Sequence, residues 1–148
     1  MIRTAILLTA SLMLSACAQP ATTGTSDPAP RGPEGFTQDT TTFCKSIPTD
    51  PRLTPIREDV ILKGPDTGTR VFNQKFISDP QKPILMLYQS LLDQCIDKMS
   101  RDLPGHDAEA ERIKRGFDAN IANLYDGKIT FGQYNRTYLK VMGTPIPD

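Results

Sequence analysis

Residues 83–105, PILMLYQSLLDQCIDKMSRDLPG, decide the fold of this chain of 148 residues. Apolar side chains recur every three or four positions along the stretch, which places them on one face of a helix of about 20 residues. Proline fits the first turn of a helix, so Pro83 marks the start, and Pro104-Gly105 marks the end. We therefore expect a long amphipathic helix over about residues 83–103. Its apolar face comprises Ile84, Tyr88, Leu91, Leu92, Cys95, Ile96, Met99 and Leu103.

Two shorter helices are predicted after this one. Asp107 is a suitable cap for a helix over about residues 108–124, because its side chain can accept a hydrogen bond from a free backbone N–H. Thr130 followed by Gln133 is a capping-box pattern and predicts a helix over about residues 131–142. Short loops favour antiparallel neighbours, so the three helices should form one core. The expected buried stripes are Ala110, Ile113, Phe117, Ile121 and Leu124 on one helix, and Phe131, Tyr134, Tyr138, Val141 and Met142 on the other.

The proline-rich segment before Pro83 predicts less regular structure. Thr40–Cys44 is a candidate short strand or extended run, and the three prolines from residue 48 to residue 55 disfavour regular structure after it. Residues 59–63 and 70–72 are candidate strands of a small hairpin, and loops packed on the helices are the alternative. We expect a mainly α fold: a single domain over residues 36–143, with this irregular segment packed on a three-helix core, and a tail over residues 144–148.

Residues 17–35 predict a linker. Gln19 to Gly35 contains four prolines and three glycines, with Thr, Ser and Ala between them. The apolar content is too low for burial, so we expect this segment to be disordered.

The first sixteen residues predict a signal peptide. Met1-Ile2-Arg3 carries one positive charge, and Ala5–Leu14 is a mostly apolar run of about ten residues, too short to cross a bilayer. The next motif, Leu14-Ser15-Ala16-Cys17, resembles the lipobox of bacterial lipoproteins. An ordinary secretory signal, cut near Ala16 or Ala18, is the alternative.

The resemblance implies a lipid anchor. In bacterial lipoproteins the thiol of the lipobox cysteine, here Cys17, becomes a diacylglyceryl thioether, the chain is cut before it, and the new amine is usually acylated as well. Palmitate is the expected kind of acyl group. Ala18 is not the aspartate that retains such proteins in the inner membrane, so the resemblance implies the periplasmic face of the outer membrane. The expected partner is therefore a lipid bilayer.

Cys44 and Cys95 remain once Cys17 is lipidated. An even pair in an oxidising compartment predicts one disulfide, which would close a loop of about 50 residues. Such a bond stabilises a fold by roughly 3–4 kcal/mol in the chain-entropy model. Two separate thiols are the alternative.

The sequence contains no recognisable catalytic, metal or cofactor motif. Lysine plus arginine and aspartate plus glutamate number 17 each, without a basic stripe, which argues against nucleic acid as a partner. His106 is the only histidine, and we expect it in a solvated loop. Asp126-Gly127 resembles the middle of an EF-hand loop, but the other ligand positions lack carboxylates, so a turn is expected. The tyrosines Tyr125, Tyr134 and Tyr138 are expected mostly in the core.

These observations favour a non-enzymatic interaction or structural module of the cell envelope, partnered by an envelope protein or peptidoglycan. The run over residues 123–135, NLYDGKITFGQYN, is similar to segments of small bacterial envelope proteins. Two alternatives remain open. An enzyme acting on the cell wall or a small molecule would need two carboxylates in one cleft. A carrier of an apolar ligand would need an apolar cavity between the helices and the proline-rich half. The oligomeric state is not predicted.

Overall fold

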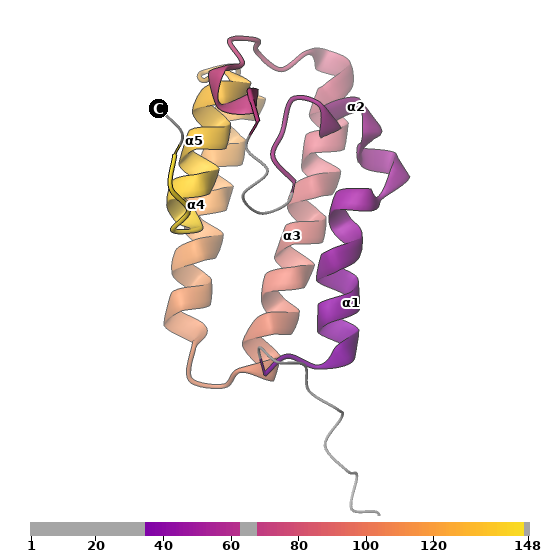
Figure 1. Cartoon of the computed structure of the whole chain (residues 1–148), viewed down its shortest axis with the longest axis vertical. Helices are drawn as coiled ribbons and strands as arrows, with labels where there is room; N and C mark the ends of the chain where they lie inside the picture. Colours follow the sequence, from indigo (N-terminus) through magenta and orange to yellow (C-terminus); the bar gives the residue numbers. More distant parts are fainter. Residues whose placement is uncertain (1–34, 63–67, 147–148) are drawn as a thin grey trace, which may run out of the picture.

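The structure, a computed structural model, describes residues 35–62 and 68–146, and its fold is mainly α (Figure 1). The predicted signal peptide, Cys17 and nearly all of the predicted linker lie outside the described residues. So do residues 63–67, which include the last residue of the first candidate hairpin strand, and the last two residues of the predicted tail. The α-helices are α1 Gln38–Ser46, α2 Thr54–Arg57, α3 Lys82–Asp102, α4 Asp107–Tyr125 and α5 Phe131–Val141. Short 3-10 turns accompany them: η1 Ile47–Thr49, η2 Pro51–Leu53, η3 Arg70–Phe72 and η4 Asp79–Gln81.

The three helices predicted after Pro83 are confirmed as α3, α4 and α5. Pro83 lies in the first turn of α3, and both hydrogen bonds of the capping box between Thr130 and Gln133 are present at the start of α5. The predicted cap of α4 is wrong by one residue, because His106 occupies the cap position without a side-chain hydrogen bond and Asp107 begins the helix. Met142, expected on a buried face, is 51% exposed because α5 ends at Val141.

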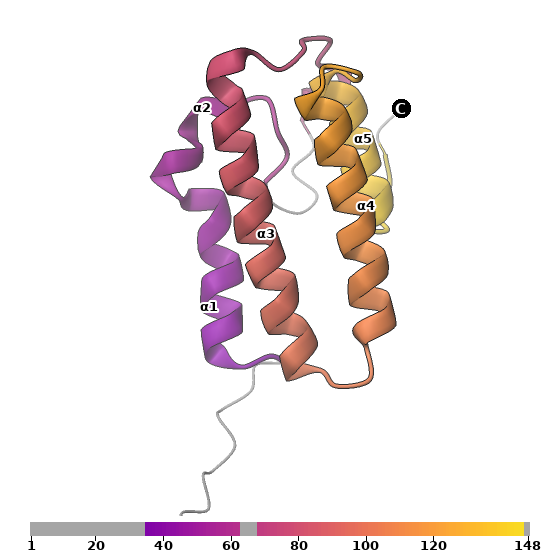
Figure 2. The same ribbon diagram turned by 180° about the vertical axis from the view of Figure 1, so that it is seen from behind.

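The helices form a bundle centred on α3. α1 and α4 flank α3 on opposite sides, and α5 packs on α4 near the end of the bundle where α3 begins (Figures 1 and 2). α3 and α4 run antiparallel, as do α4 and α5. The described chain begins at the other end of the bundle, next to the end of α3.

The first prediction for the proline-rich segment is wrong: Thr40–Cys44 lies inside α1 and is neither a strand nor an extended run. The start of this helix is fixed by Thr37, whose Oγ1 accepts a hydrogen bond from the N–H of Thr40 at 3.3 Å. The Oδ2 atom of Asp102, at the end of α3, accepts hydrogen bonds from the N–H and the hydroxyl of Thr37 at 2.7 and 2.9 Å. These contacts with a distant residue override the weak helix propensity of three consecutive threonines.

The candidate hairpin is not formed, and the alternative of packed loops is correct for the described residues. Residues 59–62 are an irregular stretch with three buried apolar side chains, and the run at 70–72 is the η3 turn. One side chain replaces the strand pairing. Asn135 in α5 is fully buried, and its amide makes hydrogen bonds with the backbones of Ile61, Asp59 and Arg70. The loop is therefore attached to the helices by a buried amide.

Candidate functional site

An apolar groove lies in the half of the bundle that α5 does not cover. α3 has 21 residues, α4 has 19 and α5 has 11. At about 1.5 Å per residue, α5 is about 15 Å shorter than α3. Past the C-terminal end of α5, toward the end of α3, the space between α1, α3 and α4 is a groove of about 570 Å³.

Each of the three helices contributes apolar side chains to the groove. Leu92, Ile96 and Met99 of α3 form its floor. All three belong to the apolar face that was predicted for this helix. Several of these side chains are only partly buried although they pack against the core, Leu92 and Met99 among them. The remaining apolar lining is Phe36, Cys44, Ile47, Pro48, Leu62, Cys95, Leu103, Ala110, Ile113, Phe117 and Met142.

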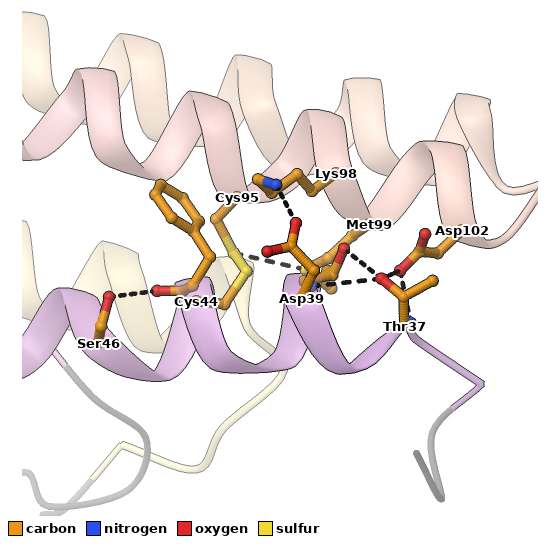
Figure 3. The surroundings of a disulfide bond; sticks show 10 residues. Thr37, Asp39, Cys44, Ser46, Cys95, Lys98, Met99 and Asp102 are labelled. Carbon is orange, nitrogen blue, oxygen red and sulfur yellow. Dashed lines mark hydrogen bonds and ion pairs between the residues drawn. A yellow bond between two sulfur atoms is a disulfide. The ribbon is translucent and has the colours of Figure 1, made fainter. Parts of the chain in front are cut away.

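The predicted disulfide joins one wall of the groove to its floor. Cys44 of α1 and Cys95 of α3 are bonded, with their Cα atoms 5.3 Å apart (Figure 3). Both residues line the groove. Lys98 of α3 pairs with Asp39 of α1, and its Nζ lies 5.5 Å from the centre of the Phe43 ring. The sequence predicted the pairing of Cys44 in the irregular segment with Cys95 in the long helix, but not that Cys44 lies in a helix or that the bond borders a cavity.

The opposite wall belongs to α4, and polar contacts attach it to α3. Gln89 donates to Asp118 at 2.8 Å, and Lys114 pairs with both Asp93 and Asp118. None of these four residues lines the groove. The apolar surface of α4 is therefore left facing the cavity, with Ala110, its smallest side chain there, in the wall.

The rim of the groove carries few charges. Lys45 and Glu109 are the charged side chains among the described residues that line it, and Glu109 forms a bidentate pair with Arg112. The hydrogen bonds from Arg112 hold the pKa of Glu109 below its ordinary value, so this carboxyl is an anion at neutral pH. At the inner end, burial raises the pKa of Tyr138, which keeps its hydroxyl neutral. An apolar cavity with a sparse polar rim is the usual environment of a small-molecule site, and its volume falls within the typical range of about 300–1,000 Å³.

The other residues considered in the sequence do not converge on a site. His106 is exposed, as expected, and reaches only the rim of the groove. Tyr134 and Tyr138 are in the core, whereas Tyr125 is 38% exposed at the far end of the bundle. Within the described ranges, no group of three His, Cys, Asp or Glu residues is placed to hold a metal ion. Among the helices that the structure describes, none has the length and apolarity needed to cross a membrane.

Sequence reasoning assigned the groove residues to the core. The spacing of Leu92, Met99 and Ile113 correctly gives the faces that point inward, but it does not report whether another element covers them. One signal was present: the third predicted helix, residues 131–142, is shorter than the helix over residues 83–103 on which the bundle is built. In comparisons with known proteins, no family model, curated protein or solved structure matches this chain.

Proposed function

We propose that this protein is a non-enzymatic lipoprotein of the bacterial cell envelope that binds an apolar ligand of the acyl-chain class in the groove. The predicted lipobox supports attachment through acylated Cys17, and the resemblance supports the periplasmic face of the outer membrane. The observation that carries the ligand proposal is the groove of about 570 Å³ between α1, α3 and α4. Its position between the helices and the proline-rich half is the feature that the carrier alternative required.

The chemistry of the lining favours an acyl chain over a polar ligand. A buried methylene contributes about 0.8 kcal/mol, so about ten of them contribute about 8 kcal/mol. That free energy corresponds to a dissociation constant of about 1 μM before the cost of association, so we expect micromolar or weaker binding. Lys45 at the rim is suited to a carboxylate or phosphate head group, whereas the lining provides little for a sugar or a peptide bond to contact.

A binding experiment with a matched pair of variants tests the proposal. The mature chain is secreted without lipid by replacing the leader with an ordinary signal and introducing Cys17→Ala. Ala110→Trp introduces a large side chain into the groove wall, and Ala122→Trp introduces the same side chain at an exposed position of the same helix. We expect binding of radiolabelled palmitate to weaken at least ten-fold with Ala110→Trp and to remain unchanged with Ala122→Trp. Equal binding by both variants, or no binding by the parent, would contradict the groove as the site.

Two measurements test the anchor separately. The intact protein purified from its own membranes should exceed its amino-acid mass by that of a diacylglyceryl group and an acyl group. Fractionation should move the protein out of the membrane pellet when the leader is replaced and Cys17 is changed to alanine. A native mass with no added lipid would refute the anchor and leave the binding result intact.

A docking site for another envelope protein is the second candidate function. Phe72 and Phe76, in and after the η3 turn, are 51% and 57% exposed, at the end of the bundle opposite the start of the described chain. Exposed aromatic side chains are enriched in protein interfaces. In-cell crosslinking followed by mass spectrometry should recover one reproducible partner, and the double variant Phe72→Ser/Phe76→Ser should lose it. Recovery of the partner by the variant would exclude this surface.

A further inference from the structure

The groove extends to the end of the bundle where the described chain begins. Phe36, the second described residue, lines the groove, as does Leu103 at the end of α3. The next residue, Thr37, is held against Asp102 by two hydrogen bonds. The segment that precedes Gly35 therefore joins the domain next to one end of the groove.

The length of that segment allows its first residue to reach the groove. Gly35 lies eighteen positions after Cys17 in the sequence, with seventeen residues between them. A flexible coil of this length has an end-to-end distance of about 20–25 Å and extends to about 60 Å. The uncovered part of the bundle is about 15 Å long, so a group attached to Cys17 reaches every part of the groove.

The composition of the segment determines what can occupy the groove. Residues 18–34, AQPATTGTSDPAPRGPE, contain no Leu, Ile, Val, Phe or Met. This peptide has no side chain large and apolar enough to cover Leu92, Ile96 and Met99 on the floor. In the lipidated protein, the only large apolar groups attached to the segment are the acyl chains on Cys17.

We propose that one acyl chain of the protein's own Cys17 occupies the groove in the membrane-anchored state. This inference rests on the proposed lipidation and on the proposed acyl-chain site. Tethering keeps the chain at a local concentration in the millimolar range next to the groove. The transfer costs little free energy because the chain moves from the apolar interior of the bilayer to the apolar groove. The other two chains remain inserted in the bilayer.

This arrangement has two consequences for the bound state. The mouth of the groove faces the bilayer, because the acyl chains that stay inserted are attached to the same residue as the one that is bound. A free ligand must displace the tethered chain, so the lipidated protein binds palmitate more weakly than the unlipidated protein does.

A crosslinking experiment on the native lipidated protein tests the proposal. Cells are fed a photoactivatable fatty acid, and the protein is purified and placed in nanodiscs that hold one copy each. After irradiation and digestion with trypsin, we expect the lipidated peptide Cys17–Arg31 to be joined to a peptide from α1, α3 or α4. The matched pair supplies the control: Ala110→Trp should reduce this product at least five-fold, and Ala122→Trp should leave it unchanged.

The other outcomes each refute the inference. Adducts found only on bilayer lipids would show that the acyl chains stay in the membrane. Equal products from both tryptophan variants would show that the contact is outside the groove. Products that join two copies, detected by mixing isotopically light and heavy protein in larger discs and absent from single-copy discs, would assign the chain to a neighbouring molecule. Palmitate binding by the unlipidated chain is measured independently, so the proposed function can stand when this inference fails.

Discussion

Replacing Asn135 with leucine should break the attachment of the proline-rich half to the helices. The side chain is fully buried, and it makes three hydrogen bonds to the backbone of one loop. Its Oδ1 accepts from the N–H of Ile61 at 2.9 Å, while its Nδ2 donates to the carbonyls of Asp59 and Arg70 at 2.8 and 3.0 Å. Leucine has a similar size and a better helix propensity, so the substitution removes the hydrogen bonds without disturbing α5.

The magnitude follows from the three backbone groups that lose their partner. A buried polar group left without a hydrogen bond costs about 1–3 kcal/mol. Allowing for partial access of water to the loop, we expect Asn135→Leu to lower the free energy of unfolding by about 3–6 kcal/mol. A small domain has about 5–15 kcal/mol in total, so the loss is a large fraction of its stability.

Two other asparagines provide a graded series for the assay. The Nδ2 of Asn120 makes one buried hydrogen bond, to the carbonyl of Tyr134 at 2.9 Å, and Asn120→Leu should cost about 1–3 kcal/mol. Asn123 is exposed on the same helix, and Asn123→Leu should change stability by less than about 0.5 kcal/mol. Urea unfolding of the unlipidated chain, followed by circular dichroism, measures all three. A cost for Asn135→Leu no larger than that for Asn123→Leu would refute the reasoning.

Three further predictions concern the disulfide, the close packing of Gly132 against the backbone, and alkaline pH. The double variant Cys44→Ser/Cys95→Ser should lose about 4 kcal/mol, from the entropy of a loop spanning 51 residues, and should bind palmitate more weakly because α1 is freed. Gly132→Ala should destabilise by more than about 2 kcal/mol in urea unfolding, because its Cβ would meet backbone carbonyl oxygens at 2.7 Å. Burial raises the pKa of Tyr88 and Tyr134, so stability should be intact below the unfolded value of about 10 and fall above it, with tyrosinate absorbance appearing only on unfolding.

Each of these predictions has a control or a result that contradicts it. Reduction of the parent should reproduce the effect of the double serine variant, and unchanged stability on reduction would exclude a formed disulfide. Gly116→Ala is the matched glycine variant, because its Cβ meets the movable side chain of Val141, so it should cost clearly less than Gly132→Ala. Ionisation of all four tyrosines in the folded protein near pH 10 would contradict burial of Tyr88 and Tyr134.

The helices after Pro83 could be predicted because their signals are local. Pro83, the capping pair Thr130 and Gln133, and the spacing of apolar residues act within a few positions of the chain, and all of them operate in the structure. α1 could not be predicted this way. Its start depends on Asp102, which lies 65 positions away from Thr37 in the sequence, and no local pattern reports such a contact. The same holds for Asn135, because no local pattern reports that its buried amide bonds to the backbone of residues 65 to 76 positions away.

The groove is the part of the fold that periodicity cannot reveal, and its chemistry is what supports a ligand. The spacing of apolar residues identifies the inward face of a helix. It does not indicate how long the neighbouring element is that covers this face. α5 ends at Val141, so the faces of α1, α3 and α4 that continue past it remain apolar over a stretch that no described residue covers. An uncovered surface of this kind favours association in water unless another apolar group fills it. Residues 18–34 contain no large apolar side chain, so the proposed filling group is an acyl chain, and the one proposed for Cys17 would belong to the same chain.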